Sequence, residues 1–231
     1  MLRSPLQFHG ISDDGSFVRQ VVVEHLVIAG WTGRDRAAME AHIEELAALG
    51  VRRPPATPMF YRVAASLLTT ADAIQVSGRA TSGEVEPVVV ADEDGPWVTV
   101  GSDHTDREAE THGITMAKQL CAKPIAPVLW RLGDVADHWD ALVVRAHATV
   151  EGVRRLYQEG PVSVMRTPAD LIARYTGGHP TLPAGTAMFC GTMAVPGGIA
   201  PADVFEIEID DPVLERTIRH AYRIEPLPVT G

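Results

Sequence analysis

The stretch GEVEPVVVADEDGPWVTVGSDHTDRE, residues 83–108, decides the fold class. Two apolar runs, GEVEPVVVA and PWVTVG, lie on either side of the turn sequence DEDGP, and this order predicts a β-hairpin. Because side chains alternate along a strand, we expect Glu84 and Glu86 on the same face. Asp103 follows the second run, so a hairpin would bring its carboxylate close to the other two. Three converging carboxylates suit a hard divalent cation with oxygen ligands.

Each of these motifs also has a simpler explanation. The E-x-E pair fits the solvated face of an edge strand, and Pro87 favours an edge because proline cannot donate to a sheet ladder. The polar stretch SDHTDRE, residues 102–108, fits a loop that caps the following helix. The acidic residues 92–94 are interpreted as part of the turn. The metal hypothesis therefore depends on whether the two runs pair.

Short strands dominate the rest of the chain, and we expect few helices. Asp35 is a good N-cap for a helix that ends at Leu49 before Gly50, and Thr167 followed by Pro168 begins another. Residues 106–119 could form a third. Strand-like runs are MFYRVA (59–64), DAIQVSG (72–78), IAPVLWRL (125–132), TAMFCGT (186–192), DVFEIEI (203–209) and VLERTIRHAYRIE (213–225), with a hairpin at 140–160. The pattern predicts a β-rich α+β protein and lacks the regular βαβ alternation of a Rossmann or TIM fold.

The composition of the 231-residue chain limits the function classes. The formal net charge is −10 and no Lys/Arg cluster exceeds two residues, so nucleic-acid binding is not expected. No apolar run reaches the roughly 18 residues of a membrane span, and no signal peptide is evident. Cys121 and Cys190 lack a disulfide framework, which favours a cytoplasmic setting. We expect a small N-terminal segment, residues 1–28, before a main domain at 29–231.

Together these motifs resemble the fumarylacetoacetate hydrolase superfamily. GEVE (83–86) matches its E-x-E strand, and TVGSDHTDRE (99–108) resembles its G-Y-T-x-x-N-D-x-S-x-R-D stretch. Lys118 matches the lysine that follows, and PIAP (124–127) matches a P-x-G-P-type turn. LPAGTAMFCGTMAVPGGIAPADVFEIEID (182–210) resembles the family's L-x-x-G-D-x-x-x-x-G-T-P block and the P-G-D-x-V-x-V that follows. The likeness runs from about residue 28 to 226 and indicates a divergent branch whose function is undefined.

The resemblance implies a fold, a metal and a binding site. The implied fold is a fumarylacetoacetate-hydrolase-like mixed β-sandwich roll with a few helices, in a catalytic domain at 29–231 that forms a homodimer. The connection between the E-x-E strand and the aspartate is shorter here than in most members, so one wall of the cleft is in question. The implied site consists of a Mg²⁺ ion (or Mn²⁺ or Ca²⁺) on Glu84, Glu86 and Asp103, with Arg107, Lys118 and Thr192 available to a carboxylate substrate.

Some superfamily members carry a His-x-x-Glu pair on a lid helix, in which the histidine activates water. His42 and Glu45 have this spacing, and residues three apart on a helix share a face. A histidine polarised by a carboxylate is a suitable general base near neutral pH. The alternative is that His42 is a surface residue on a helix rich in alanine and glutamate. His104 adjoins Asp103, but we expect it to have a packing or solvent role.

These residues lead to one main hypothesis and several alternatives. The main one is a metal-dependent hydrolase that cleaves a C–C bond in a small 1,3-dicarbonyl or acyl-pyruvate type acid, with His42, Glu45 and Lys118 as catalytic residues. The same metal–enolate chemistry would also serve a decarboxylase, a tautomerase or a hydratase. A non-catalytic keto-acid-binding protein and an unrelated β-rich domain are the remaining alternatives.

Overall fold

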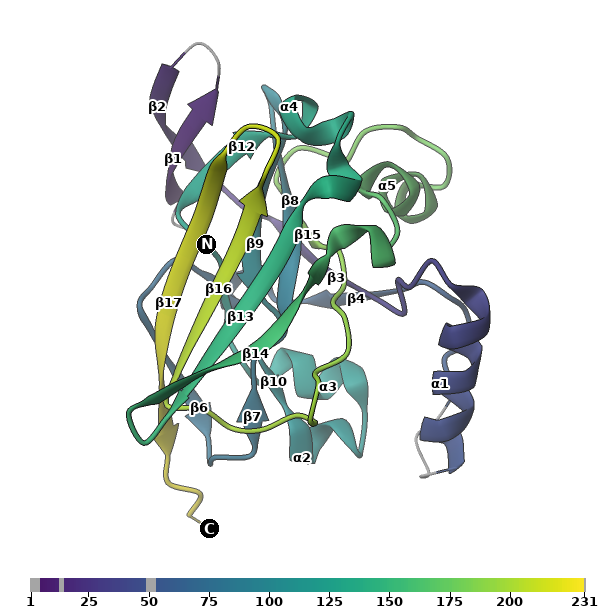
Figure 1. Cartoon of the computed structure of the whole chain (residues 1–231), viewed down its shortest axis with the longest axis vertical. Coiled ribbons are helices and arrows are strands. Elements are labelled where there is room, and N and C mark those ends of the chain that lie inside the picture. The colour runs from purple at the N-terminus through teal and green to yellow at the C-terminus, as the bar shows by residue number, and fades with distance from the viewer. Residues whose placement is uncertain (1–4, 13–14, 49–52, 231) are drawn as a thin grey trace.

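The computed structural model describes residues 5–12, 15–48 and 53–230. Two β-sheets form the framework of this part of the chain (Figure 1). The larger sheet has the strand order β2 (Gly15–Val21), β1 (Leu6–Ser12), β12 (Val128–Arg131), β9 (Gly95–Ser102), β8 (Val85–Asp92), β15 (Thr186–Phe189), β3 (His25–Gly30) and β4 (Met59–Val63). The smaller has the order β14 (Val153–Pro161), β13 (Val143–Val150), β16 (Val204–Asp211), β17 (Arg216–Leu227) and β6 (Ala73–Ser77).

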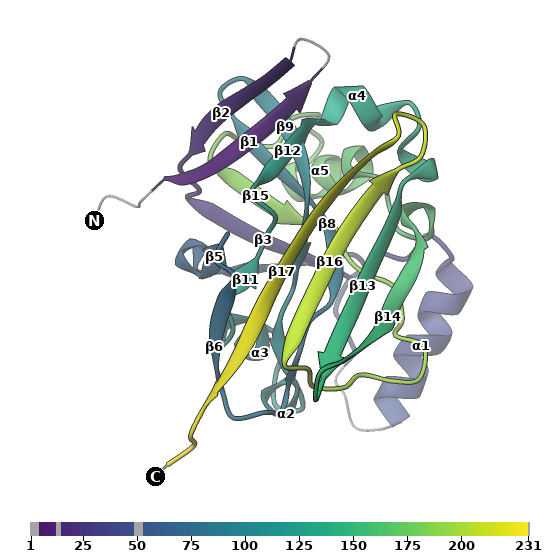
Figure 2. The same cartoon turned by 60° about the vertical axis from the view of Figure 1, so that its left-hand side comes forward.

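The expected central hairpin is formed by β8 and β9, which pair antiparallel from Val85↔Ser102 to Asp92↔Gly95. The α+β, β-rich class is therefore confirmed. The boundary expected between the N-terminal segment and the main domain, at residues 28 and 29, falls inside β3. β1 pairs with β12 in the same large sheet. Figure 2 shows the β1–β2 hairpin as an extension of that sheet beyond one end of the smaller sheet.

Five α-helices and several short strands complete the part of the chain described. The helices are α1 (Arg36–Ala48), α2 (Arg107–Glu110), α3 (Ile114–Gln119), α4 (Leu132–Ala136) and α5 (Pro168–Thr176). The short strands are β5 (Leu68–Thr69), β7 (Thr81–Ser82), β10 (Thr105–Asp106) and β11 (Lys123–Pro124), and three-residue 3₁₀ turns lie at 65–67, 139–141 and 162–164. None of these helices has the length and apolar run that a bilayer crossing would need.

The helix ends follow the expected capping chemistry. Asp35 accepts hydrogen bonds from Ala37 N and Ala38 N, so it starts α1 as expected, whereas the end expected at residues 49–50 lies outside the described residues. Thr167 accepts from the Asp170 amide at the start of α5, and Gly177 ends that helix with a φ of 72°. The single helix expected at 106–119 is two short helices, because the backbone of Gly113 is extended between them.

The hydrophobic core has a main layer between the two sheets. Side chains of the large sheet meet side chains from the inner face of the small sheet there, and the cluster includes Val85, Val98, Val100, Trp130, Val144, Phe205, Ile207, Ile218 and Tyr222. A second cluster lies on the opposite face of the large sheet. It joins Phe8 of β1 to Tyr61 of β4 through Val88 and Phe189, so the sheet curves around it.

Candidate active site

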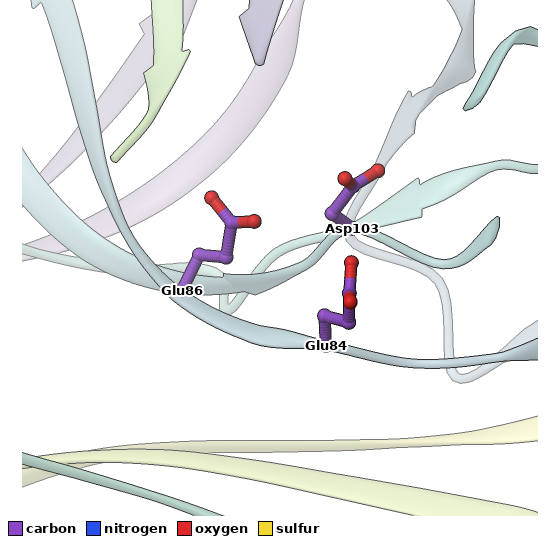
Figure 3. A group of neighbouring side chains, drawn as sticks. All are labelled: Glu84, Glu86 and Asp103. Carbon is purple, nitrogen blue, oxygen red and sulfur yellow. The ribbon is translucent and has the colours of Figure 1, made fainter. Parts of the chain in front are cut away.

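The three acidic residues singled out in the sequence converge at one end of the β8–β9 hairpin (Figure 3). Each offers a carboxylate oxygen, and the three oxygens lie within 4.8 Å of one another. Val85 faces the core between the sheets, so Glu84 and Glu86, on either side of it, project to the opposite face. The Asp103 amide donates to the Glu84 carbonyl oxygen at 3.0 Å and fixes the end of the hairpin. The hairpin geometry predicted from residues 83–108 is confirmed.

The structure excludes the simpler explanation of a solvated edge strand. β8 lies between β9 and β15 in the large sheet, and Glu86 is only 2% exposed. Pro87 lies opposite Cys190, directly after β15 ends, and its carbonyl accepts from Cys190 N at 2.9 Å. The missing proline N–H removes only the reciprocal bond of this last pair, where the ladder with β15 stops.

Three cations surround the carboxylates. Lys118 of α3 donates to Asp103 Oδ2 and lies 4.0 Å from Glu84 Oε2. Lys123, completely buried, lies 3.2 Å from Asp103 Oδ1 and donates to the His104 carbonyl oxygen at 2.5 Å. On α2, Arg107 Nη2 lies 3.3 Å from Glu84 Oε1. Buried charges need such partners, because an isolated charge in a low-dielectric interior is strongly unfavourable.

The surroundings shift the pKa values of Glu86 and Asp103 in opposite directions. Burial raises the pKa of Glu86 well above its usual range, and the neighbouring Asp103 raises it further. Burial also acts to raise the pKa of Asp103, but Lys118 and Lys123 outweigh it and lower that pKa to about 2. Burial acts to lower the pKa of Lys118, yet the acidic cluster raises it overall, so its ammonium group stays charged at neutral pH. Without a bound cation, Glu86 therefore favours a proton while Asp103 favours the ionised form.

The turn after β15 completes the site. The Gly191 amide donates to Glu86 Oε2 at 2.6 Å. Thr192 Oγ1 donates to the Val85 carbonyl oxygen at 2.7 Å and accepts from Gln158 Nε2 at 3.0 Å. Thr192 was expected to donate to a substrate carboxylate through its hydroxyl or nearby amides, and here the hydroxyl donates to the main chain. The hydroxyl proton is used in this contact because the Val85 carbonyl oxygen needs a hydrogen-bond donor at the end of the strand.

The donor set fits a hard divalent cation. Every candidate ligand atom is a carboxylate oxygen, which is the ligand type that Mg²⁺, Mn²⁺ and Ca²⁺ prefer. Metal–oxygen bonds of about 2.0–2.6 Å place ligands on opposite sides of an ion roughly 4–5 Å apart, which agrees with the 4.8 Å spread here. Binding would require the Lys118 ammonium to share or leave Asp103 Oδ2, because that oxygen faces the other carboxylates.

Glu84 and Glu86 line a cleft of about 830 Å³, and the fully buried Asp103 contacts another of its lining residues, Lys118. The first turn of α1, the helices α2 and α3, the turn after β15 and the 3₁₀ turn at 162–164 contribute to its walls. The lining includes Glu84, Glu86, Arg107 and Lys118, so two of the three expected metal ligands share one accessible space with these two cations. Arg107 is already held by Ser82 Oγ and by the carboxylates of Glu84 and Glu110.

A family model described as "Protein of unknown function (DUF2848)" matches residues 29–222, most of the chain. The chain belongs to this family. Among curated proteins, no relative matches this DUF2848 protein.

Solved structures with the same fold cover nearly the whole chain. A putative fumarylpyruvate hydrolase from Burkholderia cenocepacia has a TM-score of 0.62 at 19% identity, over 99% of this chain and 97% of its own. A putative fumarylacetoacetate isomerase/hydrolase from Oleispira antarctica has a TM-score of 0.62 at 14% identity, over 92% and 97%. The apo form of a 2-keto-3-deoxy-D-arabinonate dehydratase has a TM-score of 0.62 at 16% identity, over 96% and 79%. The resemblance to the fumarylacetoacetate hydrolase superfamily is thus confirmed at the level of fold.

The expected general base of this DUF2848 protein lies on α1. The main chain of His42 and Glu45 is helical, but their side chains lie outside the described part of the structure. Asp35, Ala38 and Met39 of the same segment line the cleft. His104 is fully buried and bonded to Tyr222 Oη and Thr81 Oγ1, and burial first and then Lys123 lower its pKa to about 3. It therefore has the packing role expected.

Sequence reasoning missed two residues that shape the site. Lys123 stands in the apolar stretch CAKPIAP, where a lone lysine signals a buried partner. Gly191 lies in the strand-like run TAMFCGT, and nothing there indicates that its backbone has a φ of 94° and that its amide holds Glu86. The signal for Lys123 was available in the sequence, whereas the contact of Gly191 with β8 depends on a strand that follows about a hundred residues later.

Proposed function

We propose that this DUF2848 protein is a metal-dependent hydrolase that cleaves a C–C bond in a small acyl-pyruvate or other 1,3-dicarbonyl acid. The observation that carries the proposal is the convergence of Glu84, Glu86 and Asp103, two of which, Glu84 and Glu86, line a cleft together with Lys118 and Arg107. The fold is shared with proteins described as a putative fumarylpyruvate hydrolase and a putative fumarylacetoacetate isomerase/hydrolase, which supports this reaction class.

Glu84, Glu86 and Asp103 would hold the metal ion, with Mg²⁺ expected ahead of Mn²⁺ or Ca²⁺. A bound divalent cation supplies a Lewis acid and a template for the keto and carboxylate oxygens of the substrate. In the proposed reaction, water adds to the distal carbonyl carbon and the bond between that carbon and the neighbouring CH₂ breaks. The products are a carboxylic acid and pyruvate, or its substituted equivalent, after the leaving carbon takes a proton.

The protein's own side chains have separate roles in this scheme. Lys118 keeps its charge and donates a hydrogen bond to the oxygen on which negative charge develops. Arg107, held rigidly by its acidic neighbours, provides a fixed positive field that orients the substrate carboxylate. The turn at Gly191 and Thr192 keeps Glu86 and the end of β8 in place, so Thr192 positions the site through its main-chain contact.

His42 and Glu45 are proposed as the general base and its orienting carboxylate. Position 42 lies one helical turn beyond Ala38 and three residues beyond Met39, both of which line the cleft. That spacing continues the same side of α1. Variants His42→Gln and Glu45→Gln should lower hydrolysis sharply while leaving metal binding unchanged.

The test combines metal binding with product analysis. Metal-stripped protein is titrated with Mg²⁺ and Mn²⁺ by calorimetry, and wild type is compared with Glu86→Gln. Glutamine suits this site because burial already favours the neutral form of Glu86. Glu206→Gln on the outer face of β16 is the matched control. We expect saturable binding that Glu86→Gln removes and the control retains.

Turnover of acetylpyruvate is then followed by NMR of the products. Acetate and pyruvate establish hydrolysis. Loss of CO₂, hydrogen exchange without cleavage, or hydration would indicate a decarboxylase, a tautomerase or a hydratase, and metal binding without any turnover would indicate a keto-acid-binding protein. The absence of saturable metal binding in wild type would refute the metalloenzyme proposal.

Two further features are proposed with the function. A homodimer is expected from the resemblance to the superfamily, and light scattering of the purified chain tests it. A cytoplasmic location is consistent with Cys121 and Cys190, which are free and buried.

A further inference from the structure

The cleft has an ionic end and an apolar outer wall. The ionic end is a single connected group, because ion pairs of 4.0 Å or less link Arg107, Lys118, Glu84 and Asp103. The outer wall comes from α1, α3, the 3₁₀ turn at 162–164 and the connection from β15 to β16, drawn in light green in Figure 1. Its apolar side chains are Met39, Ile114, Val164, Met165, Met193, Val195 and Ile199.

The connection after β15 runs from the ionic end of the cleft to its apolar outer wall. Gly191 is buried and bonds to Glu86, whereas Met193 and Val195 are half-buried and Ile199 is 50% exposed. All four residues line the same cleft. The lining therefore changes from charged to apolar as the chain runs outward from the carboxylates.

The charges of the cleft leave no partner for a second anionic group. Among the described lining residues, the only cations are Arg107 and Lys118, and both contact the acidic cluster. The other charged lining residues outside that cluster are Asp35 and Glu110, which are acidic. A carboxylate at the far end of a substrate would lose hydration against apolar side chains and gain no counter-charge there.

We propose, on the basis of the function proposed above, that the substrate is a 2-oxo acid with a single carboxylate and an apolar alkyl or aryl group at its far end. The 2-oxo acid group would lie at the ionic end, and the tail would lie along the wall formed by Val164, Met193, Val195 and Ile199. The cleft volume of about 830 Å³ exceeds what a three-carbon acid fills and leaves room for a tail of several carbons.

The methionines of this wall should allow substrate tails of different shapes to bind. Met39, Met165 and Met193 contribute three flexible thioether side chains to the lining. Such side chains adapt to different apolar shapes. We therefore expect affinity to increase with tail length over several carbons, with straight and aromatic tails both accepted.

The experiment measures binding of two series of unreactive probes by calorimetry with saturating Mg²⁺. One series is pyruvate, 2-oxobutanoate, 2-oxohexanoate and 2-oxooctanoate. The other is the dicarboxylates 2-oxoglutarate, 2-oxoadipate and 2-oxosuberate. We expect about a three- to fourfold gain in affinity for each buried methylene in the first series. We expect no such gain in the second, and weaker binding than for the monocarboxylate of equal length.

A charge introduced at the mouth should reverse this preference. Val164 is 46% exposed, so Val164→Lys leaves the core intact while giving the far end of the cleft a cation. We expect this variant to bind 2-oxosuberate at least tenfold more tightly than wild type does. Val213→Lys, at a position that is 55% exposed and does not line the cleft, is the matched control and should change neither series.

The outcomes separate this proposal from the proposed function. Tighter binding of the dicarboxylates by wild type, or affinities independent of chain length, would overturn the apolar-tail proposal and leave the metal site standing. A length-dependent gain that persists in Glu86→Gln without Mg²⁺ would support the apolar subsite and contradict the metal site. If no oxo acid of either series binds, the apolar-tail proposal fails, and the metal titration and turnover of acetylpyruvate still decide the proposed function.

Discussion

Replacing Gly191 by alanine perturbs the turn that holds Glu86, and the structure gives the size of the effect. The backbone of Gly191 has a φ of 94°, a region that side chains of L-residues rarely adopt. A Cβ atom built on it would lie 1.8 Å from Oγ1 of Thr32, which is 3% exposed. The substitution therefore combines backbone strain with a steric clash that cannot move into solvent.

The expected cost has two parts. A left-handed backbone costs a residue with a Cβ about 1–2 kcal/mol. Overpacking in a buried position adds about 1–3 kcal/mol. Gly191→Ala should thus lower the free energy of unfolding by roughly 2–5 kcal/mol, a large fraction of the 5–15 kcal/mol of a typical domain.

Gly197 provides a matched control six residues further along the same connection. Its φ is 86°, and nothing lies within 4 Å of a Cβ built there. Gly197→Ala should therefore lose only the backbone term of about 1–2 kcal/mol. Urea unfolding followed by tryptophan fluorescence measures both variants. The double variant Gly191→Ala/Thr32→Gly removes the three atoms nearest to the new Cβ, so its clash term should be much smaller.

The same variant has a second readout at the metal site. The Gly191 amide donates to Glu86 Oε2, so a shift of the turn should also weaken Mg²⁺ binding, whereas Gly197→Ala should not affect it. Equal losses of stability in Gly191→Ala and Gly197→Ala, together with unchanged Mg²⁺ affinity, would refute the assigned role of the turn.

Two further predictions concern buried charges of the site. Lys123→Met leaves Asp103 with one cation fewer and should lower the free energy of unfolding by about 3–5 kcal/mol in urea titrations. The control Arg79→Met removes an exposed ion pair and should lower it by less than about 1 kcal/mol. Equal losses in the two variants would contradict the role of Lys123. Because the pKa of Glu86 is raised in the metal-free protein and the metal binds its ionised form, Mg²⁺ affinity should rise with pH until that pKa is passed, and binding should release a proton. Calorimetry in two buffers of different ionisation enthalpy measures the release, and identical heats in both would be inconsistent with it.

The convergence of the three carboxylates was predictable because it depends on local rules. Alternation along a strand placed Glu84 and Glu86 on one face, and the DEDGP turn set the register that brought Asp103 beside them. Capping chemistry at Thr167 was equally local, and the helix begins where it was expected. The commitment of the Thr192 hydroxyl to Val85 was not predictable, since those residues are neighbours only in the folded chain.

By itself the sequence determined which residues share a face, where the hairpin turns and which side chains could bind a cation, because these follow from the short periods of the backbone. Only the tertiary structure decided that β8 is a central strand, since β15 pairs with it from far along the chain. That pairing buries Glu86, and the packing of β11 buries Lys123 beside Asp103. The pKa of an ionisable group depends on its burial and on the charges beside it. Both come from contacts between distant segments here, so these contacts determine the chemistry of the site.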